Sequence, residues 1–380
     1  MQRPSAHPET YLSVDRKAEL FAFLVDNIEN WKSMQFATLT FERTMGLTNQ
    51  VFIVSASHTN PATDVHRIIL RLFGEKSERC SESSSWSSVF FSRPDEERHL
   101  QIVQECVKGA EILAFFGNGR IERFLDGDQL NPRTIRSNQV LCCIAKVMFK
   151  AHCSIWRPIE IEYPREMIER GRNYVIEKME LWLDLGCQLM NQKIESKLRE
   201  FRYDWKPWLY SALENMKSLV SKTKSPIILA HNDAHYGNFI HHANDTVTLI
   251  DWEYSFPNYR AFDLANFLVE MMSDYSKRPN QHVKNLPTRE MVIHFLECYK
   301  AASDKYECKE NMVESVEVLL EEVETFAPVS LMFWAYWQVL MAAKEEQENH
   351  KMTEDSFDYL DGALCRFKIY SALQHNKWFK

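Results

Sequence analysis

The sequence has few glycines, no CxxC pair and no signal-like start. Ten glycines and thirteen prolines are too few for a fibrous or low-complexity chain. Nine cysteines, an odd number, argue against a complete disulfide framework. The start, MQRPSAHPETYLSVDRK, has no apolar core of a signal peptide. The most apolar run, LMFWAYWQVLMAA (331–343), is shorter than the roughly 20 residues of a membrane span. We therefore expect no transmembrane segment and a reducing, cytoplasmic location.

The chain also lacks a block of basic residues. Its 45 Lys and Arg residues against 53 Asp and Glu residues give a net charge of −8. A well-mixed acidic chain does not resemble a general nucleic-acid binder, so we expect no nucleic-acid partner. Of its 380 residues, 45% are hydrophobic, which is enough for one large or two moderate domains.

The order of patterns along the chain predicts two unlike lobes. Helical spacing at 13–31 is followed by β-rich runs from about 36 to 75. A Ser-rich loop at 76–95, which we expect to be mobile, comes next. A helical stretch and two short strands around 118–119 follow it. Beyond about 125 the chain is mostly helical, with strands only at 227–230 and 247–250. No repeat of fixed period is visible. We expect an α+β protein with a β-rich lobe at 1–122 and a helical lobe at 123–380.

The two short strands expected at 227–230 and 247–250 lead into the candidate site. The stretch HNDAHYGN (231–238) follows the apolar run IILA, and Asp251 ends the run VTLI. Asp233 can accept a proton from a substrate hydroxyl. Asn238 and Asp251 offer hard oxygen ligands for Mg²⁺, which phosphoryl-transfer sites hold with only one or two carboxylates. Together they are the groups that kinase-type phosphoryl transfer needs.

Each of these residues also has a plainer interpretation. Either aspartate alone is more often a turn residue at a strand end, and only the combined spacing favours a site. We expect His231 to order the loop by hydrogen bonding rather than to take part in chemistry. We expect Asp263 to cap the helix that begins with LANFLVEMM.

The motif HNDAHYGNFI…LIDWEYSFPNYRAFDLANFLVE resembles the choline/ethanolamine kinase family, a branch of the protein-kinase-like fold. GLTNQVF (46–52) looks like the family's nucleotide loop, IILRLFG (68–74) like the strand with the basic phosphate contact, and GRIERFLDG (119–127) like the hinge at adenine. The resemblance runs from about residue 40 to about residue 370. It implies a bilobal fold, ATP and Mg²⁺ as cofactors, and a homodimer, for which the sequence has no readable signature.

The resemblance also implies roles for particular residues. Asp233 becomes the catalytic base, and Asn238 and Asp251 become Mg²⁺ ligands; by the same resemblance Asp263 helps to fix the catalytic loop. The positions implied for ATP are Thr48, Asn49, Arg71, Leu72, Phe73, Gly74, Glu122, Arg123, Phe124, Leu125, His235 and Asp251.

A choline pocket is implied at the other end of the site. A trimethylammonium group cannot donate hydrogen bonds, so a protein binds it with aromatic faces and a carboxylate. Trp334 and Trp337 are three positions apart and share a helix face, although such a pair alone is more often core packing. The matched positions are Tyr254, Glu270, Tyr275, Trp334, Trp337 and Tyr359.

Four positions depart from the family pattern. His235 and Arg123 each replace a frequent Gln, Cys106 replaces a frequent basic residue, and Gly362 replaces a second Tyr of the pocket. We therefore expect a diverged choline kinase that makes phosphocholine for phospholipid synthesis. The alternatives are an ethanolamine kinase, an aminoglycoside-type phosphotransferase without reason to keep the aromatic set, and a pseudokinase-like binding module, which Cys106 and His235 motivate.

Overall fold

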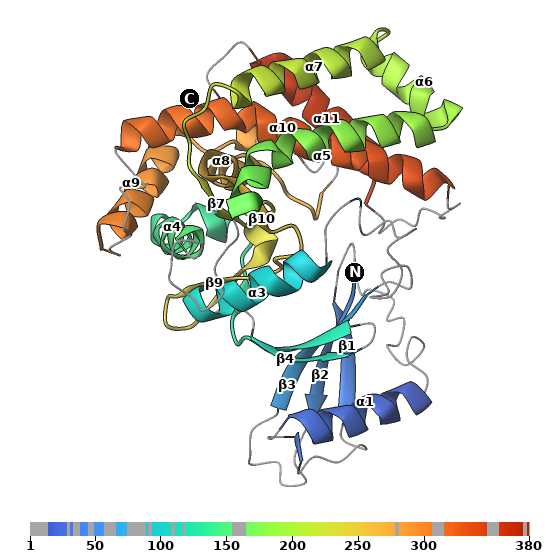
Figure 1. The fold of residues 1–380 in the computed structure, drawn as a ribbon, viewed down its shortest axis with the longest axis vertical. Coiled ribbons are helices and arrows are strands. Elements are labelled where there is room, and N and C mark those ends of the chain that lie inside the picture. Colours follow the sequence, from blue (N-terminus) through green and yellow to red (C-terminus); the bar gives the residue numbers. More distant parts are fainter. Residues whose placement is uncertain are drawn as a thin grey trace. The chain divides into compact units, whose positions relative to one another are not determined.

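The computed structural model describes residues 14–28, 31–32, 39–44, 49–56, 66–73, 89, 93–107, 111–116, 119–153, 165–277, 281–305, 315–347, 357–374 and 378–379. The chain forms two compact units (Figure 1). The first contains Met1–Arg93 and Lys108–Asp126, and the second contains Pro94–Val107 and Gly127–Lys380. Most of the Ser-rich segment 76–95 lies outside the described residues.

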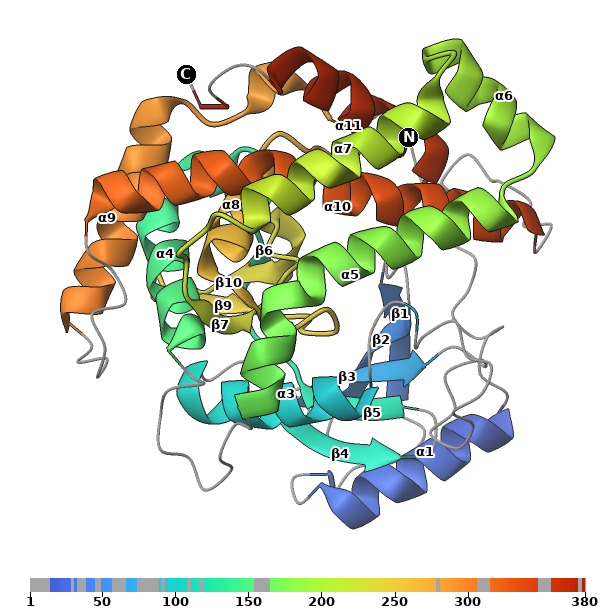
Figure 2. The same cartoon turned by 45° about the horizontal axis from the view of Figure 1, so that its top comes forward.

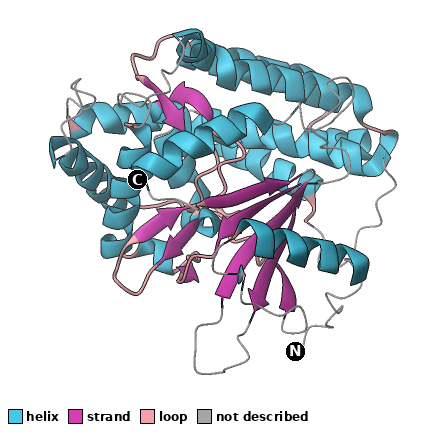
Figure 3. Cartoon of the chain, turned by 60° about the horizontal axis from the view of Figure 1, so that its bottom comes forward, coloured by secondary structure: helices cyan, strands magenta, loops and turns pink. Residues whose placement is uncertain are grey.

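The first unit is built on an antiparallel sheet of five strands with the order β1-β2-β3-β5-β4. Its elements are helix α1 (Val14–Asn27) and strands β1 (Leu39–Thr44), β2 (Asn49–Ala56), β3 (His66–Phe73), β4 (Ile112–Phe116) and β5 (Gly119–Arg123). These elements match the predicted helix and β-rich runs. Figure 3 shows the strands side by side.

Alternate side chains of this sheet form the core of the first unit. Phe52 and Val54 of β2 and Ile68 and Leu70 of β3 are buried, and they pack with Leu24 of α1. The spacing of two follows from the pleat of a strand, which turns successive side chains to opposite faces. One sheet face is thus covered by the amphipathic helix that the sequence predicts.

The second unit is mostly helical. Its helices are α3 (Arg93–Val107), α4 (Asn138–His152), α5 (Arg165–Leu189), α6 (Gln192–Phe201), α7 (Trp205–Val220), α8 (Arg260–Glu270), α9 (Arg289–Lys305), α10 (Val316–Gln347) and α11 (Tyr359–Leu373), with single 3₁₀ turns at Thr134–Arg136, Tyr236–Asn238 and Val283–Asn285. Helix α10 is central: it packs against α5, α8 and α11 (Figure 2).

Helix α10 contains the apolar run 331–343. With 32 residues it has the length and composition of a membrane span, so the run is part of a longer helix than the sequence suggested. However, 94% of its most apolar 18-residue window is buried inside the protein. Helix α10 therefore has the burial of a core helix.

Two small sheets carry the loops of the candidate site. Strand β7 (Ile227–Ala230) pairs with β10 (Phe256–Tyr259). Strands β6 (Asp128–Gln129), β8 (Phe239–His241) and β9 (Val247–Leu249) form the other sheet. The predicted strands at 227–230 and 247–250 are confirmed. Strands β6, β8 and β10 were missed, because their sequences, DQ, FIH and FPNY, lack the apolar runs that mark β7 and β9.

Two glycines of α5 allow close packing against the elements around the site. A Cβ at Gly171 would lie 2.7 Å from the carbonyl oxygen of Pro257 in β10, whereas a Cβ at Gly186 would meet the Val339 Cγ1 at 3.1 Å. A side-chain methyl can move more easily than a strand backbone.

We expect Gly171→Ala to be less stable than the matched Gly186→Ala variant. Both gain about 1 kcal/mol of helix propensity, but the clash with β10 should leave Gly171→Ala less stable than Gly186→Ala by about 1–3 kcal/mol. Urea unfolding followed by circular dichroism measures both. Equal free energies of unfolding for the two variants would show that β10 can shift to accept the added methyl group without a loss of stability.

Candidate active site

The loop after β7 is held in an unusual backbone conformation. Asn232 has φ +65°, in the left-handed region that only a few residue types adopt readily. Its side-chain Nδ2 donates to the carbonyl of Tyr254 at 2.9 Å, and its Oδ1 accepts from the Nδ2 of Asn258 at 2.8 Å. These contacts to the segment around β10 keep the loop in this conformation. They thereby fix the position of Asp233, the next residue in the chain.

Asp263 binds the backbone of the same loop. Its two carboxylate oxygens accept from the amides of His231 at 2.9 Å and Asn232 at 2.8 Å, and one of them also contacts the Nε2 of His152 at 2.9 Å. The expected helix cap is wrong: α8 begins at Arg260, and its N-cap is Tyr259. The resemblance also implied that Asp263 helps to fix the loop that carries Asp233. The two hydrogen bonds to the amides of this loop confirm that prediction.

His231 connects this loop with the one that carries Asp251. Its Nε2 lies 2.8 Å from the carbonyl of Ile250, and its Nδ1 accepts from the amide of Asp233 at 3.3 Å. The ring is fully buried and packs against Trp252 with centroids 4.7 Å apart. The predicted ordering function is confirmed.

Asp233, Asn238 and Asp251 are gathered at the ends of these short strands. The Asn238 Nδ2 donates to the carbonyl of Asp233 at 2.9 Å and to its Oδ2 at 3.2 Å. The Asn238 carbonyl accepts from the amide of Ile250 at 2.9 Å, directly before Asp251. Asp251 itself has φ +64°, a second left-handed position at the site.

Asp233 is buried among negative charges. Burial raises the pKa of Asp233 well above its ordinary value, and the negative charges of Asp251, Glu270 and Glu253 raise it further; the Asn238 amide opposes them. A bound cation relieves such repulsion. Within the described ranges, no three His, Cys, Asp or Glu side chains gather into a metal cluster. An amide oxygen and a carboxylate nevertheless fit Mg²⁺, which takes much of its shell from water and phosphates.

His235 lies beside the predicted base. Its Nε2 is 3.9 Å from the Oδ2 of Asp233, and its Nδ1 accepts from the amide of Gly237 at 3.1 Å. Burial lowers the pKa of His235 to about 4, although Glu270 acts in the opposite direction. The ring is therefore neutral near pH 7 and brings no positive charge to the site.

Four of the predicted head-group residues form one aromatic cluster. Tyr254 lies 5.2 Å from Trp334, Trp334 lies 5.5 Å from Trp337, and Trp337 lies 5.4 Å from Tyr359, measured between ring centroids. The sequence missed Phe357, whose ring contacts Tyr359 at 5.0 Å and Tyr275 at 6.2 Å. We call Tyr254, Trp334, Trp337, Tyr359 and Phe357 the aromatic cluster.

Glu270 is already paired within the protein. It accepts from Tyr275 Oη at 2.5 Å and forms an ion pair with Arg366 at 2.7 Å. Burial opposes ionisation, but the Arg366 charge and these hydrogen bonds lower the pKa of Glu270 below its ordinary value. The pairing of Glu270 with Arg366 could not be predicted, since nothing local in the sequence signals a partner 96 positions away.

Asn266 is another residue that the sequence missed. Its Nδ2 donates to the carbonyl of Ala234 at 3.2 Å, and its Oδ1 accepts from the indole Nε1 of Trp334 at 2.8 Å. One side chain of α8 thus joins the catalytic loop to the aromatic cluster. The spacing of three from Asp263 could have suggested a shared helix face.

The positions implied for ATP belong mainly to the first unit. Arg71 and Arg120 both donate to the Oε1 of Glu122, at 3.1 and 2.6 Å. Burial opposes ionisation, yet the two guanidiniums lower the pKa of Glu122 to about 2.

The other positions implied for ATP are only partly described. Arg123 pairs with Glu111 at 2.5 Å, and Arg67 lies over the Phe124 ring. Leu72 lies in β3 and Leu125 follows β5; Thr48, Gly74 and the side chains of Asn49 and Phe73 lie outside the described part of the structure.

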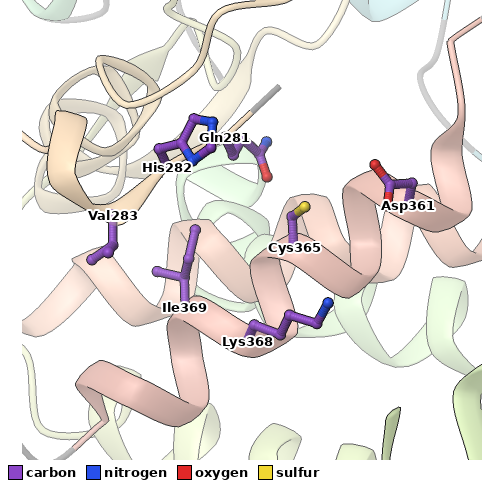
Figure 4. Close-up of a pocket in the computed structure, with 7 residues that line it drawn as sticks. All are labelled: Gln281, His282, Val283, Asp361, Cys365, Lys368 and Ile369. Atoms are coloured by element: carbon purple, nitrogen blue, oxygen red, sulfur yellow. The ribbon is translucent and has the colours of Figure 1, made fainter. Parts of the chain in front are cut away.

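A groove of about 390 Å³ lies on another face of α11 (Figure 4). Asp361, Cys365, Lys368 and Ile369 line one wall, and Gln281, His282 and Val283 line the other. Tyr359 and Arg366 belong to a different face of the same helix. This groove is therefore separate from the aromatic cluster.

A β-rich unit together with a helical unit that carries an Asp-Asn-Asp set defines a kinase-like phosphotransferase. Residues 42–371 match the family model described as choline/ethanolamine kinase. The chain belongs to the choline/ethanolamine kinase family. The predicted resemblance is confirmed, and with it a kinase that acts on an alcohol group with ATP as donor.

Individual relatives agree with this assignment. The chain is 28% identical over 338 residues to human choline/ethanolamine kinase, covering 86% of this chain and 77% of that protein. It is 29% identical over 327 residues to probable choline kinase 2 of Arabidopsis thaliana, covering 85% and 82%. A solved choline kinase of Cryptosporidium parvum has a TM-score of 0.67 at 22% identity, covering 93% and 94%. This likeness confirms the predicted bilobal, protein-kinase-like α+β fold.

We expect Asp263→Asn to lower the free energy of unfolding by about 2–4 kcal/mol, because a buried charged acceptor of several hydrogen bonds is lost. The pKa of Asp263 is lowered in the folded protein: burial opposes this, but the hydrogen bonds and charges of His152 and His231 together outweigh it. Its stabilisation is therefore complete above the unfolded-state pKa of about 3.9 and is lost as the pH falls through the lower folded value.

Urea unfolding at a series of pH values from 7 to 3 measures this difference. Asp304→Asn is the matched control, because its carboxylate lies exposed at the end of α9 and pairs with Lys300 on the same helix. A stability difference between wild type and Asp263→Asn that stays constant below pH 4 would contradict the assignment.

Proposed function

We propose that this protein transfers the γ-phosphoryl group of ATP to the hydroxyl of choline and so makes phosphocholine for phospholipid synthesis. The observation that carries the proposal is the contact between Asp233 and Asn238 in the same unit as the aromatic cluster. A phosphoryl-transfer set and a cation-binding surface on one scaffold match an amino alcohol as acceptor. The expected homodimer and cytoplasmic location remain predictions.

Asp233 is the proposed catalytic residue. It aligns the substrate hydroxyl and, in its ionised form, accepts the hydroxyl proton. Asn238 and Asp251 would hold Mg²⁺, which neutralises charge on the phosphates when bound. Most of the rate enhancement then comes from positioning and electrostatics.

The nucleotide residues are proposed with the same roles that the resemblance implies. Arg71 is the first of them, because a guanidinium can bind phosphate through two hydrogen bonds. Its pairing with Glu122 orients the guanidinium in β3. Thr48, Asn49, the segments 72–74 and 122–125, His235 and Asp251 complete the set.

The aromatic cluster favours choline as substrate. Two indoles and two phenol rings, each with its centroid within 6.4 Å of at least one other, offer the faces that a quaternary ammonium needs. Glu270 is neutralised by Arg366, so the aromatic faces carry more of the recognition. Ethanolamine is the alternative, because Gly362 leaves out one aromatic side chain that the family often has.

We expect Asp233→Asn to lower ADP release with choline by about 10²–10⁴-fold, the usual contribution of a general base. ATP binding should be retained, because the side chain keeps its size. Release of ADP by purified protein with Mg·ATP, with choline and with ethanolamine, measures this. Asp245→Asn, in the turn between β8 and β9, is the control and should keep activity. Stimulation by ethanolamine alone would replace choline as the substrate.

We expect Asp251→Asn to raise the Mg²⁺ concentration needed for half-maximal activity by about tenfold or more, because a neutral amide binds the ion more weakly than a carboxylate does. Titration of ADP release with Mg²⁺ at fixed ATP measures the shift, again against Asp245→Asn. An unchanged Mg²⁺ requirement would remove Asp251 from the metal site. ATP binding by the wild type without turnover of either substrate would favour a pseudokinase-like module.

A further inference from the structure

Gly362 leaves a space on α11 that a neighbouring side chain fills. A Cβ at this position would lie 2.9 Å from the Nε2 and 3.1 Å from the Oε1 of Gln338 in α10. A residue larger than glycine would therefore displace the Gln338 amide.

Gln338 of α10 meets Gly362 of α11 on the stretches of the two helices that carry rings of the aromatic cluster. It follows Trp337 directly and is one helical turn from Trp334. On α11, Gly362 lies three positions after Tyr359, whose ring contacts Trp337 at 5.4 Å, and four positions before Arg366, which pairs with Glu270 at 2.7 Å. The residues near Gln338 in sequence on α10, and near Gly362 on α11, thus belong to the proposed head-group site.

The amide of Gln338 has an unused acceptor. The side chain is 3% exposed, and its Oε1 is buried without a hydrogen-bond partner among the residues that the structure describes. Buried polar groups nearly always have a partner, since an unsatisfied one is costly. A ligand that supplies a donor accounts for this carbonyl oxygen better than packing does, because an apolar side chain would fill the same space without that cost.

The chemistry of the acceptor selects the ligand. Aromatic faces attract any ammonium group, including a quaternary one that has no N–H. A carbonyl oxygen adds a hydrogen bond only for a nitrogen that carries at least one N–H. Aromatic faces together with a carbonyl oxygen therefore suit both quaternary ammonium groups and ammonium groups that carry an N–H.

We propose that the side-chain carbonyl of Gln338 accepts a hydrogen bond from an N–H of the substrate's ammonium group. The site then takes ethanolamine and its mono- and dimethylated forms in addition to choline. This inference rests on the proposed function, since it concerns the head group of the same acceptor. It makes Gln338 and Gly362 the residues that set the preference between these amino alcohols.

The test compares kcat/KM for ethanolamine, N-methylethanolamine, N,N-dimethylethanolamine and choline. Gln338→Met keeps the length of the side chain and removes the acceptor. The ratio of each N–H-bearing substrate to choline should fall by about tenfold or more, the effect of one hydrogen bond to a charged group. Gly362→Ala should lower the same ratios, because its Cβ displaces the amide. Gln347→Met, at the exposed end of α10, is the matched control.

The outcomes separate this inference from the proposed function. Unchanged ratios in Gln338→Met, or an equal loss for all four substrates, would make Gln338 a packing residue and overturn the inference while the kinase function stands. Wild-type protein that turns over none of the four substrates would overturn the proposed function, and this inference with it. Melting temperatures of the variants show whether each is folded; if Gln338→Met is not, Gly362→Ala decides.

Discussion

The buried carboxylate of Asp263 is the constraint on which the candidate site depends. It accepts from two consecutive backbone amides, those of His231 and Asn232, and thereby fixes a loop whose second residue has φ +65°. Such a conformation persists only where the surrounding contacts outweigh its cost. His231 then binds the carbonyl of Ile250, so the position of Asp251 follows from that of the first loop.

One face of α8 extends this constraint through the second unit. Asp263, Asn266 and Glu270 are spaced by three and four positions and therefore share a side of the helix. The first binds the catalytic loop, the second joins that loop to Trp334, and the third pairs with Arg366 of α11. A rigid helix thus fixes the catalytic loop and the aromatic cluster relative to each other. This is the support that a site needs if hydroxyl and phosphate are to be aligned.

The sequence predicted what depends on local pattern and missed what depends on distant partners. The spacing of Asp233, Asn238 and Asp251 and the strand before each loop could be read directly. Strand β10 could not, because Pro257 argues against a strand unless it lies at a sheet edge, as it does in this two-stranded sheet. The cap expected of Asp263 failed because the helix begins three residues earlier. Arg366 and Gln338 become important only through residues that are far away in the sequence.

The two ends of the site differ in how their charge is balanced, and this difference suits their proposed tasks. Glu270 has Arg366 at 2.7 Å, so its negative charge is compensated inside the protein. At Asp233, burial and three neighbouring carboxylates act together to raise the pKa, and His235 is neutral near pH 7. A site in which burial and neighbouring negative charges raise the pKa of an aspartate favours the arrival of cations, because they remove the repulsion. The aromatic end needs no such charge, since ring faces attract an ammonium group without forming an ion pair.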